Sequence, residues 1–416
     1  MGLALLAGAG LPSAAKPPEA QTSRSGPGSV PSPELVQKIL AEISDITGLQ
    51  LKRPVPMTSI TKLEWRHWLE ARVEESAKPD EIRVEQLAMQ IFGLLPRDFD
   101  LRSAMVDLMT EQAAAVYDHR KKRMLFVQGS SADLMQEAVL VHELSHALAD
   151  QHFDMRRFLD KGPRSDESES ARLAVVEGQA MWIMMESMLR KGGQSLTKSP
   201  DLLARLDAPL RQMTAAQYPV FSKSPLSLQE SLLFPYISGL RFQQAVILKL
   251  GKEGFSAVLR DPPKNTRQIL HPELYLAHDE PGQVDLPELD ADEWKLSAKP
   301  RRLTEGDIGE LDFHVLFEQY ASKAEADAAA PAWRAGRFEL LEEGPKGRPM
   351  LRWAALWASP EDAARAFTLC LRAMEGKSRD LAWGDRSAAA AAGRNSYGAF
   401  RYRLSGARIE ALEGLP

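Results

Sequence analysis

Cysteine and long apolar runs are what this sequence most obviously lacks. Cys370 is the only cysteine among 416 residues, so no intramolecular disulfide can form. Cysteine usage therefore does not distinguish an oxidising from a reducing compartment. No apolar run reaches the roughly 18 residues of a membrane-spanning helix, so we expect no integral membrane segment. The formal net charge of −5 gives no sign of a nucleic-acid partner or of binding to an acidic membrane surface. Internal repeats, a phosphate-binding loop and a GxSxG nucleophile elbow are also absent from the sequence.

The first residues are apolar, uncharged and rich in alanine and glycine. Met1–Ala15 resembles the apolar core of a signal peptide, and Ser13-Ala14-Ala15 resembles its cleavage site, although a basic start is missing. The alternative is a flexible Ala/Gly tail. Lys16–Pro33 is rich in Pro, Ser and Gly, a composition typical of a disordered linker. We therefore expect an exported protein, periplasmic or extracellular, in which residues 1–32 precede the folded part.

The most informative stretch is His142-Glu143-Leu144-Ser145-His146, which has the form H-E-x-x-H between apolar residues. On a helix, residues four apart lie on one face, so the two histidines can present their imidazoles to one ion. Glu143 can reach the same side and take a proton from a metal-bound water. Zinc suits this set because it accepts neutral imidazole nitrogen and keeps one position for water. The alternative is a helix that carries two histidines by chance. The motif lies in an apolar stretch that predicts a helix, and Asp133 can cap the start of that helix. This setting favours metal binding over a chance occurrence of two histidines.

A third protein ligand is expected, because two histidines and a water do not hold zinc tightly. Glu177 is an isolated acid inside the apolar helical stretch Ala171–Met184, and a buried lone carboxylate needs a partner. Its alternative role is a surface ion pair with Arg172 or Lys191.

His152 competes with Glu177 for the role of third ligand. Its spacing matches the longer pattern H-E-x-x-H-x-x-G-x-x-H, except that Ala149 stands where that pattern has glycine. The glycine allows a sharp turn out of the helix. With alanine the helix can continue, and His152 then points away from the other two histidines. We therefore favour Glu177.

The motif and the helix that carries Glu177 resemble those of a known class of enzymes. H-E-x-x-H followed by a helix with Glu177-Gly178-x-Ala180 is similar to the gluzincin class of zinc peptidases, which have the thermolysin-like ligand set. The surrounding stretch also resembles uncharacterised bacterial exported proteins with the same motif. The resemblance implies that Zn²⁺ is held by His142, His146 and Glu177, with Glu143 as the general base.

One supporting residue of that class is missing here. Thermolysin has an aspartate four residues after its glutamate ligand, and this aspartate supports a histidine; in this chain the position is Met181. Asp150, one turn after His146, is a candidate to replace it. The alternative for Asp150 is a surface charge near the helix end.

Two more groups of residues are candidates for substrate contacts. Ala113–Asp118 and Arg123–Gln128 predict a hairpin, and in gluzincin folds a strand near the metal offers its edge to an extended peptide. We expect the second strand to do this; an ordinary buried hairpin is the alternative. His271, Tyr236 and Tyr275 are candidates to donate hydrogen bonds to an oxyanion, with packing and capping as their alternative roles.

The rest of the sequence predicts an α+β protein in two parts. A mostly helical zincin-like domain with a small sheet or hairpin is expected over residues 33–295, and Pro281–Pro300 is acidic and proline-containing like a boundary. A small α+β domain of unassigned role is expected over residues 304–416. Its predicted elements are strands at 337–341, 350–357, 400–404 and 407–411, a helix capped by Ser359, and a helix or linker at 388–392.

These observations lead to two hypotheses of different classes. The first is a zinc metallopeptidase that acts on peptides or proteins. The second is a catalytically silent protein with a zincin fold that acts as a binding module, and the intact Glu143 argues against it because binding needs no base. Hydrolysis of a non-peptide amide is a third possibility, since ligands alone do not define a substrate. The sequence does not fix the oligomeric state.

Overall fold

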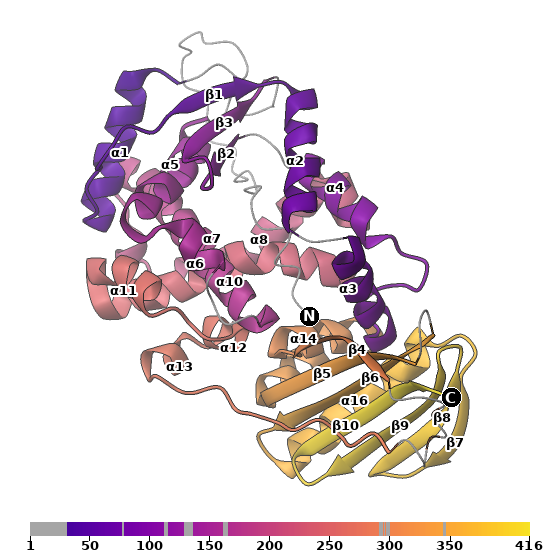
Figure 1. Cartoon of the computed structure of the whole chain (residues 1–416). Coiled ribbons are helices and arrows are strands. Elements are labelled where there is room, and N and C mark those ends of the chain that lie inside the picture. The colour runs from indigo at the N-terminus through magenta and orange to yellow at the C-terminus, as the bar shows by residue number, and fades with distance from the viewer. Residues whose placement is uncertain are drawn as a thin grey trace.

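The computed structural model describes residues 31–76, 79–111, 115–128, 136–160, 165–290, 294, 296, 300–343 and 347–416. A helical region is followed by a sheet-rich C-terminal region, which confirms the expected α+β class (Figure 1). No helix among the described residues is long and apolar enough to cross a membrane. The signal-like segment up to residue 30 and the proposed cap Asp133 lie outside the described residues.

Two helices of the first region begin at capping residues. Ser32 Oγ accepts a hydrogen bond from Leu35 N at 3.3 Å, and Thr61 and Glu64 form a reciprocal capping box, typical of the sequence Thr-x-x-Glu. The helices are α1 Pro33–Thr47, α2 Lys62–Ser76, α3 Pro79–Phe92, α4 Leu101–Glu111, α5 Gln136–Phe153, α6 Met155–Asp160, α7 Asp166–Lys191, α8 Leu202–Gln217, α9 Pro219–Lys223, α10 Leu226–Leu250, α11 Gly254–Arg260, α12 Thr266–Leu270 and α13 Pro272–Leu276.

Two helix boundaries differ from expectation. The apolar stretch Phe234–Leu250, which ends before Gly251, predicts a helix from its sequence, but in the structure this helix begins at Leu226 and continues through Pro235. The polar composition of Asp160–Ser170 predicts a loop, but α7 begins at Asp166 within this stretch. Ser165 caps the helix, and the acidic residues that follow favour its positive N-terminal end. Local composition therefore predicts the wrong start for both α7 and α10, because the packing of these two helices against each other sets their lengths.

A small three-stranded sheet lies beside the helices. It contains β1 Met57–Ile60, β2 Ala115–Asp118 and β3 Arg123–Val127, in the order β1-β3-β2. The predicted hairpin is confirmed, since β2 and β3 pair antiparallel; Ala113 and Ala114 lie outside the described residues. The expectation that the second strand offers its edge is wrong, because β3 is central and pairs with β1 on its other side. The free edges within the described residues belong to β1 and β2.

The C-terminal region is built on a seven-stranded sheet in the order β4-β5-β6-β10-β9-β8-β7. The strands predicted at 337–341, 350–357, 400–404 and 407–411 and the helix capped by Ser359 are confirmed. Residues 388–392, expected as helix or linker, lead into β8 instead, because pairing with two neighbouring strands outweighs the local preference of alanine. The elements are β4 Arg301–Asp307, α14 Glu310–Tyr320, α15 Lys323–Ala329, β5 Trp333–Glu343, β6 Arg348–Trp357, α16 Pro360–Lys377, β7 Ala382–Arg386, β8 Ala390–Asn395, β9 Gly398–Ser405 and β10 Arg408–Leu415.

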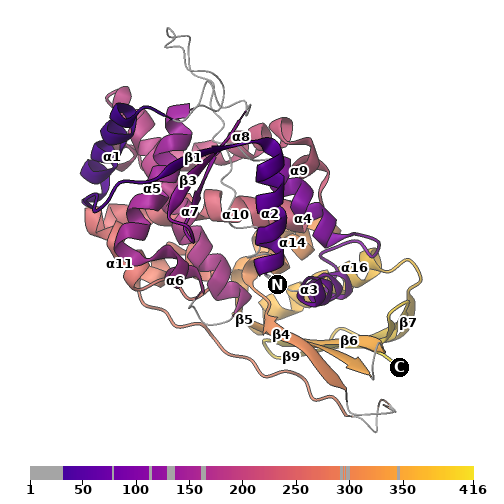
Figure 2. The ribbon, with the colours of Figure 1, turned by 45° about the horizontal axis from the view of Figure 1, so that its top comes forward.

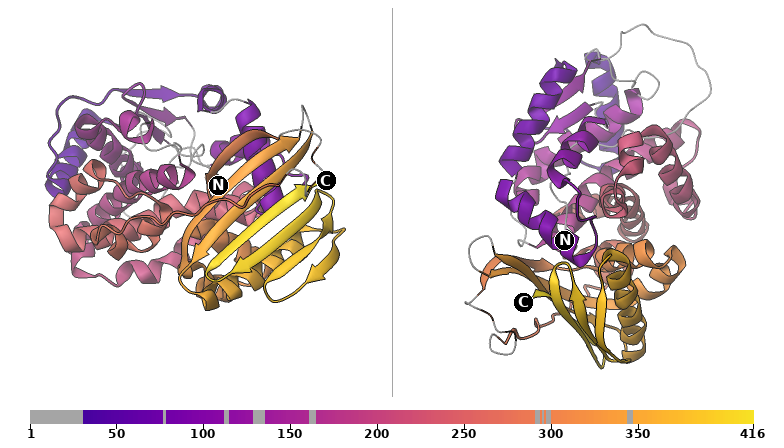
Figure 3. Two further views of the ribbon diagram at one scale, coloured as in Figure 1. Left: turned by 60° about the horizontal axis from the view of Figure 1, so that its bottom comes forward. Right: turned by 90° about the vertical axis from the view of Figure 1, so that its right-hand side faces the viewer.

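Helices from both regions cover one face of this sheet. Helices α3 and α16 lie beside each other over it (Figure 2), and Phe92 of α3 makes edge contacts with Phe313 and Trp353 at centroid distances of 5.7 Å each. Figure 3 shows the layer of helices against the sheet from the side. Leu289 and Trp294 pack on the other face of the sheet. The two regions therefore share an apolar core, and the domain boundaries stay a prediction.

The crossing of α7 and α10 brings their backbones together at two glycines. A Cβ atom on Gly178 would lie 2.1 Å from the carbonyl carbon of Gly239, and one on Gly239 would lie 2.2 Å from the carbonyl oxygen of Ala174. The side chain next to Gly178 in α7 is Glu177, so the close crossing also places the candidate third ligand.

Substitution of Gly178 by alanine is expected to destabilise the protein. The added methyl group would overlap the backbone of α10, and overpacking of this kind costs roughly 1–3 kcal/mol or more. Thermal or denaturant unfolding of Gly178→Ala measures the loss. Gly192→Ala, at the end of the same helix, is the matched control, because its Cβ would meet only Leu189 O at 3.5 Å. Equal stability of the two variants would contradict the close crossing.

Candidate metal centre

Helix α5 presents His142, Glu143 and His146 in the interior of the protein. The helix packs between β2 and α7, and all three side chains are mostly buried. The rings of His142 and His146 lie 4.8 Å apart between centroids, and their Nε2 atoms are 3.1 Å apart. The helical spacing therefore brings the two imidazoles together on one face, as the sequence predicts.

Glu177 of α7 completes this group. Its Oε2 atom lies 3.2 Å from His142 Nε2 and 3.4 Å from His146 Nε2. The three residues form a buried cluster that could hold a metal ion. The alternative ion pairs of Glu177 are absent from the described residues, since Arg172 binds Phe158 O and Lys191 binds Glu137.

His152 lies away from this cluster. Helix α5 continues to Phe153, so Ala149 does not interrupt it, and His152 Nε2 bonds to Gln50 O at 2.8 Å. The structure thus brings His142, His146 and Glu177 together and leaves His152 outside.

The three candidate ligands perturb one another electrostatically. Burial alone would raise the pKa of Glu177, but the charge of His146 and hydrogen bonds with both histidines hold this pKa well below its usual range. Burial alone would lower the pKa of His146, but Glu177 raises it above its usual value. The carboxylate therefore stays ionised and requires a cation, either a proton on imidazole or a metal ion.

Glu143 is held by the neighbouring strand. Its Oε2 atom accepts a hydrogen bond from Tyr117 N of β2 at 2.7 Å, which leaves Oε1 able to accept from another donor. Burial raises the pKa of Glu143, although the adjacent His142 and His146 oppose this. The carboxyl is a proton acceptor placed beside the cluster without being part of it.

The expected role of Asp150 is wrong. It hydrogen-bonds to neither histidine; it accepts from Tyr117 Oη at 2.7 Å, Lys122 Nζ at 2.6 Å and Met155 N at 2.7 Å. Nor is it a surface charge, since it is 3% exposed. The hydrogen bonds from Tyr117 and Lys122 show that Asp150 fastens the β2–β3 hairpin to α5. The second ring nitrogen of His142, Nδ1, is buried without a hydrogen-bond partner among the described residues.

The three candidate oxyanion donors lie in different surroundings, and only one of them is next to the cluster. The ring of Tyr236 stacks on that of His142 at a centroid distance of 6.3 Å, so it lies beside the cluster. His271 instead pairs with Glu310, with Nε2 2.8 Å from Oε1, and Tyr275 Oη donates to Asp261 O at 2.8 Å. These two side chains are engaged elsewhere in packing and capping.

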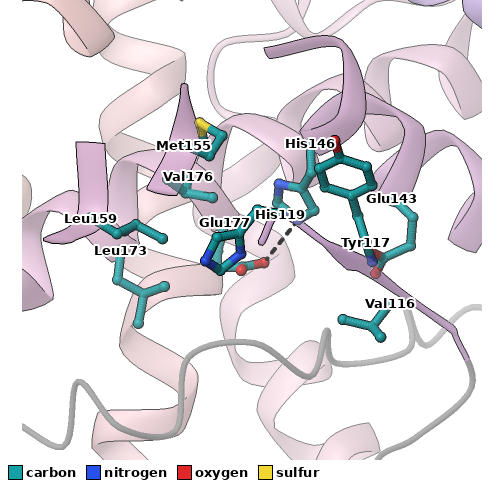
Figure 4. Close-up of a pocket in the computed structure, with 10 residues that line it drawn as sticks. All are labelled: Val116, Tyr117, His119, Glu143, His146, Met155, Leu159, Leu173, Val176 and Glu177. Atoms are coloured by element: carbon teal, nitrogen blue, oxygen red, sulfur yellow. Dashed lines mark hydrogen bonds and ion pairs between the residues drawn. The ribbon is translucent and has the colours of Figure 1, made fainter. Parts of the chain in front are cut away.

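A small pocket opens beside the cluster (Figure 4). Glu143, His146 and Glu177 line it together with His119, which the sequence did not single out. Its apolar walls are Val116, Met155, Leu159, Leu173 and Val176. The volume is about 40 Å³, enough for one or two waters. His119 lies in the turn between β2 and β3, and only the fold brings it to the site.

No protein-family model matches the chain, and no curated protein or solved structure is similar enough to match it. The resemblance to gluzincins therefore stays a prediction, and the chemistry of the site has to be inferred from its own geometry.

Loss of Glu177 is expected to abolish metal binding, whereas loss of His152 is not. Glu177→Ala removes one of three converging ligand atoms, while His152→Ala changes only a contact with Gln50. Titration of each purified variant with Zn²⁺ in the presence of a micromolar chelator measures the difference. Metal loss in His152→Ala together with retention in Glu177→Ala would show that another ligand set is used.

Metal affinity is expected to rise with pH. An imidazole ligand must be neutral, and the pKa of His146 in the metal-free protein lies above its usual value because of Glu177. Below this pKa a proton competes with the ion; above it the competition ends and the affinity levels off. Zn²⁺ titrations across about pH 5 to pH 8, the range around the usual histidine pKa, measure this dependence. An affinity that is constant across this range would contradict the assignment.

Proposed function

We propose that the protein is a zinc-dependent hydrolase of peptide bonds. The observation that carries this proposal is the convergence of His142 Nε2, His146 Nε2 and Glu177 Oε2 on one point, with the carboxyl of Glu143 beside it. Two nitrogens and one oxygen are the donor set of catalytic zinc sites that keep a fourth position open.

The spacing of the donor atoms supports zinc. Ligands about 2.0–2.2 Å from a tetrahedral ion lie roughly 3.3–3.6 Å from one another. The three separations here are 3.1, 3.2 and 3.4 Å. Larger cations that take six or more oxygen ligands fit this site poorly, because two of its three donors are imidazole nitrogens.

Each residue of the site then has a definite part in hydrolysis. A zinc ion held there would supply a Lewis acid that polarises the scissile carbonyl and lowers the pKa of water. Glu143 accepts a proton from the attacking water and passes it to the leaving nitrogen. Its hydrogen bond from Tyr117 N fixes the carboxyl for both transfers.

The strand β2 is the part of the fold suited to align a peptide. It is an edge strand among the described residues, it borders the pocket with Val116 and Tyr117, and its backbone holds Glu143. An extended peptide can pair with such an edge through backbone hydrogen bonds that tolerate many sequences. The pocket has a volume of about 40 Å³, so its walls must separate to admit a side chain.

Glu143→Gln is expected to keep zinc and lose hydrolysis. The amide oxygen can still accept from Tyr117 N, but an amide cannot take up the proton of the water. The measurements are zinc content and cleavage of a denatured protein or a broad peptide library. Glu137→Gln is the matched control on the same helix, because Glu137 forms only a partly exposed ion pair with Lys191.

The outcomes separate the proposal from its alternative. Full activity of Glu143→Gln would refute the role of this residue as the base. A wild-type protein that binds zinc and cleaves none of the substrates would favour the binding module instead.

A further inference from the structure

The turn between β2 and β3 carries a histidine to the pocket. His119 directly follows β2 and lines the same pocket as Glu143, His146 and Glu177, and its ring points into this space (Figure 4). It comes from a different element than the candidate ligands and the base. It therefore approaches the reacting centre from the side of the strand β2.

The turn that carries His119 is held on both sides. Asp118 accepts hydrogen bonds from the backbone N of Arg120 and Lys121 at 3.1 Å each, and from Arg72 Nη2 at 2.8 Å. At the other end of the turn, Lys122 Nζ bonds to the buried Asp150 of α5. These contacts fix the backbone on either side of His119, as expected for a preorganised site.

The ring of His119 is available for a ligand. Within the described part of the chain, no hydrogen bond or ion pair involves its nitrogens. Tyr117 of β2, which also lines the pocket, donates its hydroxyl to Asp150. Burial, and next the charge of Arg72, lowers the pKa of His119 to about 4, so the ring is neutral near pH 7 and offers one N–H donor.

We propose that His119 is a further catalytic residue, which donates a hydrogen bond to the carbonyl oxygen of the scissile peptide bond as that oxygen gains negative charge. This role rests on the proposed hydrolytic function. When water adds to the carbonyl carbon, the π electron pair moves to the oxygen, and the N–H of His119 stabilises it without transferring a proton. Glu143 carries the proton that the water loses. A fixed donor of this kind contributes most when the charge develops in a site that excludes bulk water.

The test combines hydrolysis with binding of two inhibitors of one peptide sequence. A phosphinic peptide carries a charged tetrahedral group that mimics the developing oxyanion, and a hydroxamate of the same sequence binds the metal without that mimicry. Calorimetry with zinc-loaded protein measures both dissociation constants. The variants are His119→Ala, His119→Gln, which retains an N–H donor, and Lys121→Ala, an exposed control in the same turn.

The expected result is selective. His119→Ala should lower kcat by roughly 10²- to 10³-fold, as for loss of one oxyanion donor. It should weaken the phosphinic peptide while leaving KM, zinc content and hydroxamate affinity near those of the wild type. His119→Gln should recover part of both losses, and Lys121→Ala should match the wild type.

Other results would overturn the role of His119. Equal weakening of both inhibitors by His119→Ala would show that the residue only supports the pocket, and no weakening of either would show that it does not contact the oxyanion. If wild-type protein loads with zinc but neither binds the inhibitors nor cleaves peptides, the proposed function fails and this role fails with it. Activity in the wild type with an unchanged His119→Ala variant would refute the role of His119 alone.

Discussion

The ionised carboxyl of Glu177, buried between two helices, is the constraint on which the site depends. A lone carboxylate is costly to bury, so its position requires cations or strong donors nearby. His142 and His146 meet this requirement from α5, at 3.2 and 3.4 Å. The contact of α7 with α10 at Gly178 and Gly239 fixes where the carboxyl lies. One close helix crossing therefore determines whether three donor atoms can converge on a single ion.

The β2–β3 hairpin is the second element that the site requires. Tyr117 joins it to α5 twice, through the hydrogen bond of its backbone N to Glu143 and that of its hydroxyl to Asp150. Lys122 binds the same buried carboxylate from the other end of the turn. The hairpin thus places the candidate base, the edge strand and His119 relative to the candidate metal ligands as one unit.

The C-terminal region braces the start of the helix that bears Glu177. The side chain of Ser165, the cap of α7, bonds to Asp307 of β4. Further away, the buried pair Lys377–Glu413 is 2.6 Å long, and Lys377 also binds Ile91 O of α3 at 2.6 Å. Loss of either partner of such a buried pair would leave an uncompensated charge in the interior, so the pair ties α16, β10 and α3 together. The sheet therefore supports the helical region and supplies no candidate ligand among the described residues.

The sequence alone determined what short-range physics controls. The spacing of His142 and His146, the capping signals and the strand pairs at 337–341 and 350–357 follow from helix and sheet periodicity, so they could be predicted. An isolated acid in an apolar helix also identified Glu177. Tertiary structure decided the rest: Asp150 turned toward Tyr117 and Lys122, β2 took the edge in place of β3, and His119 reached the pocket. These outcomes depend on contacts between distant segments, for which a single sequence carries no periodic signal.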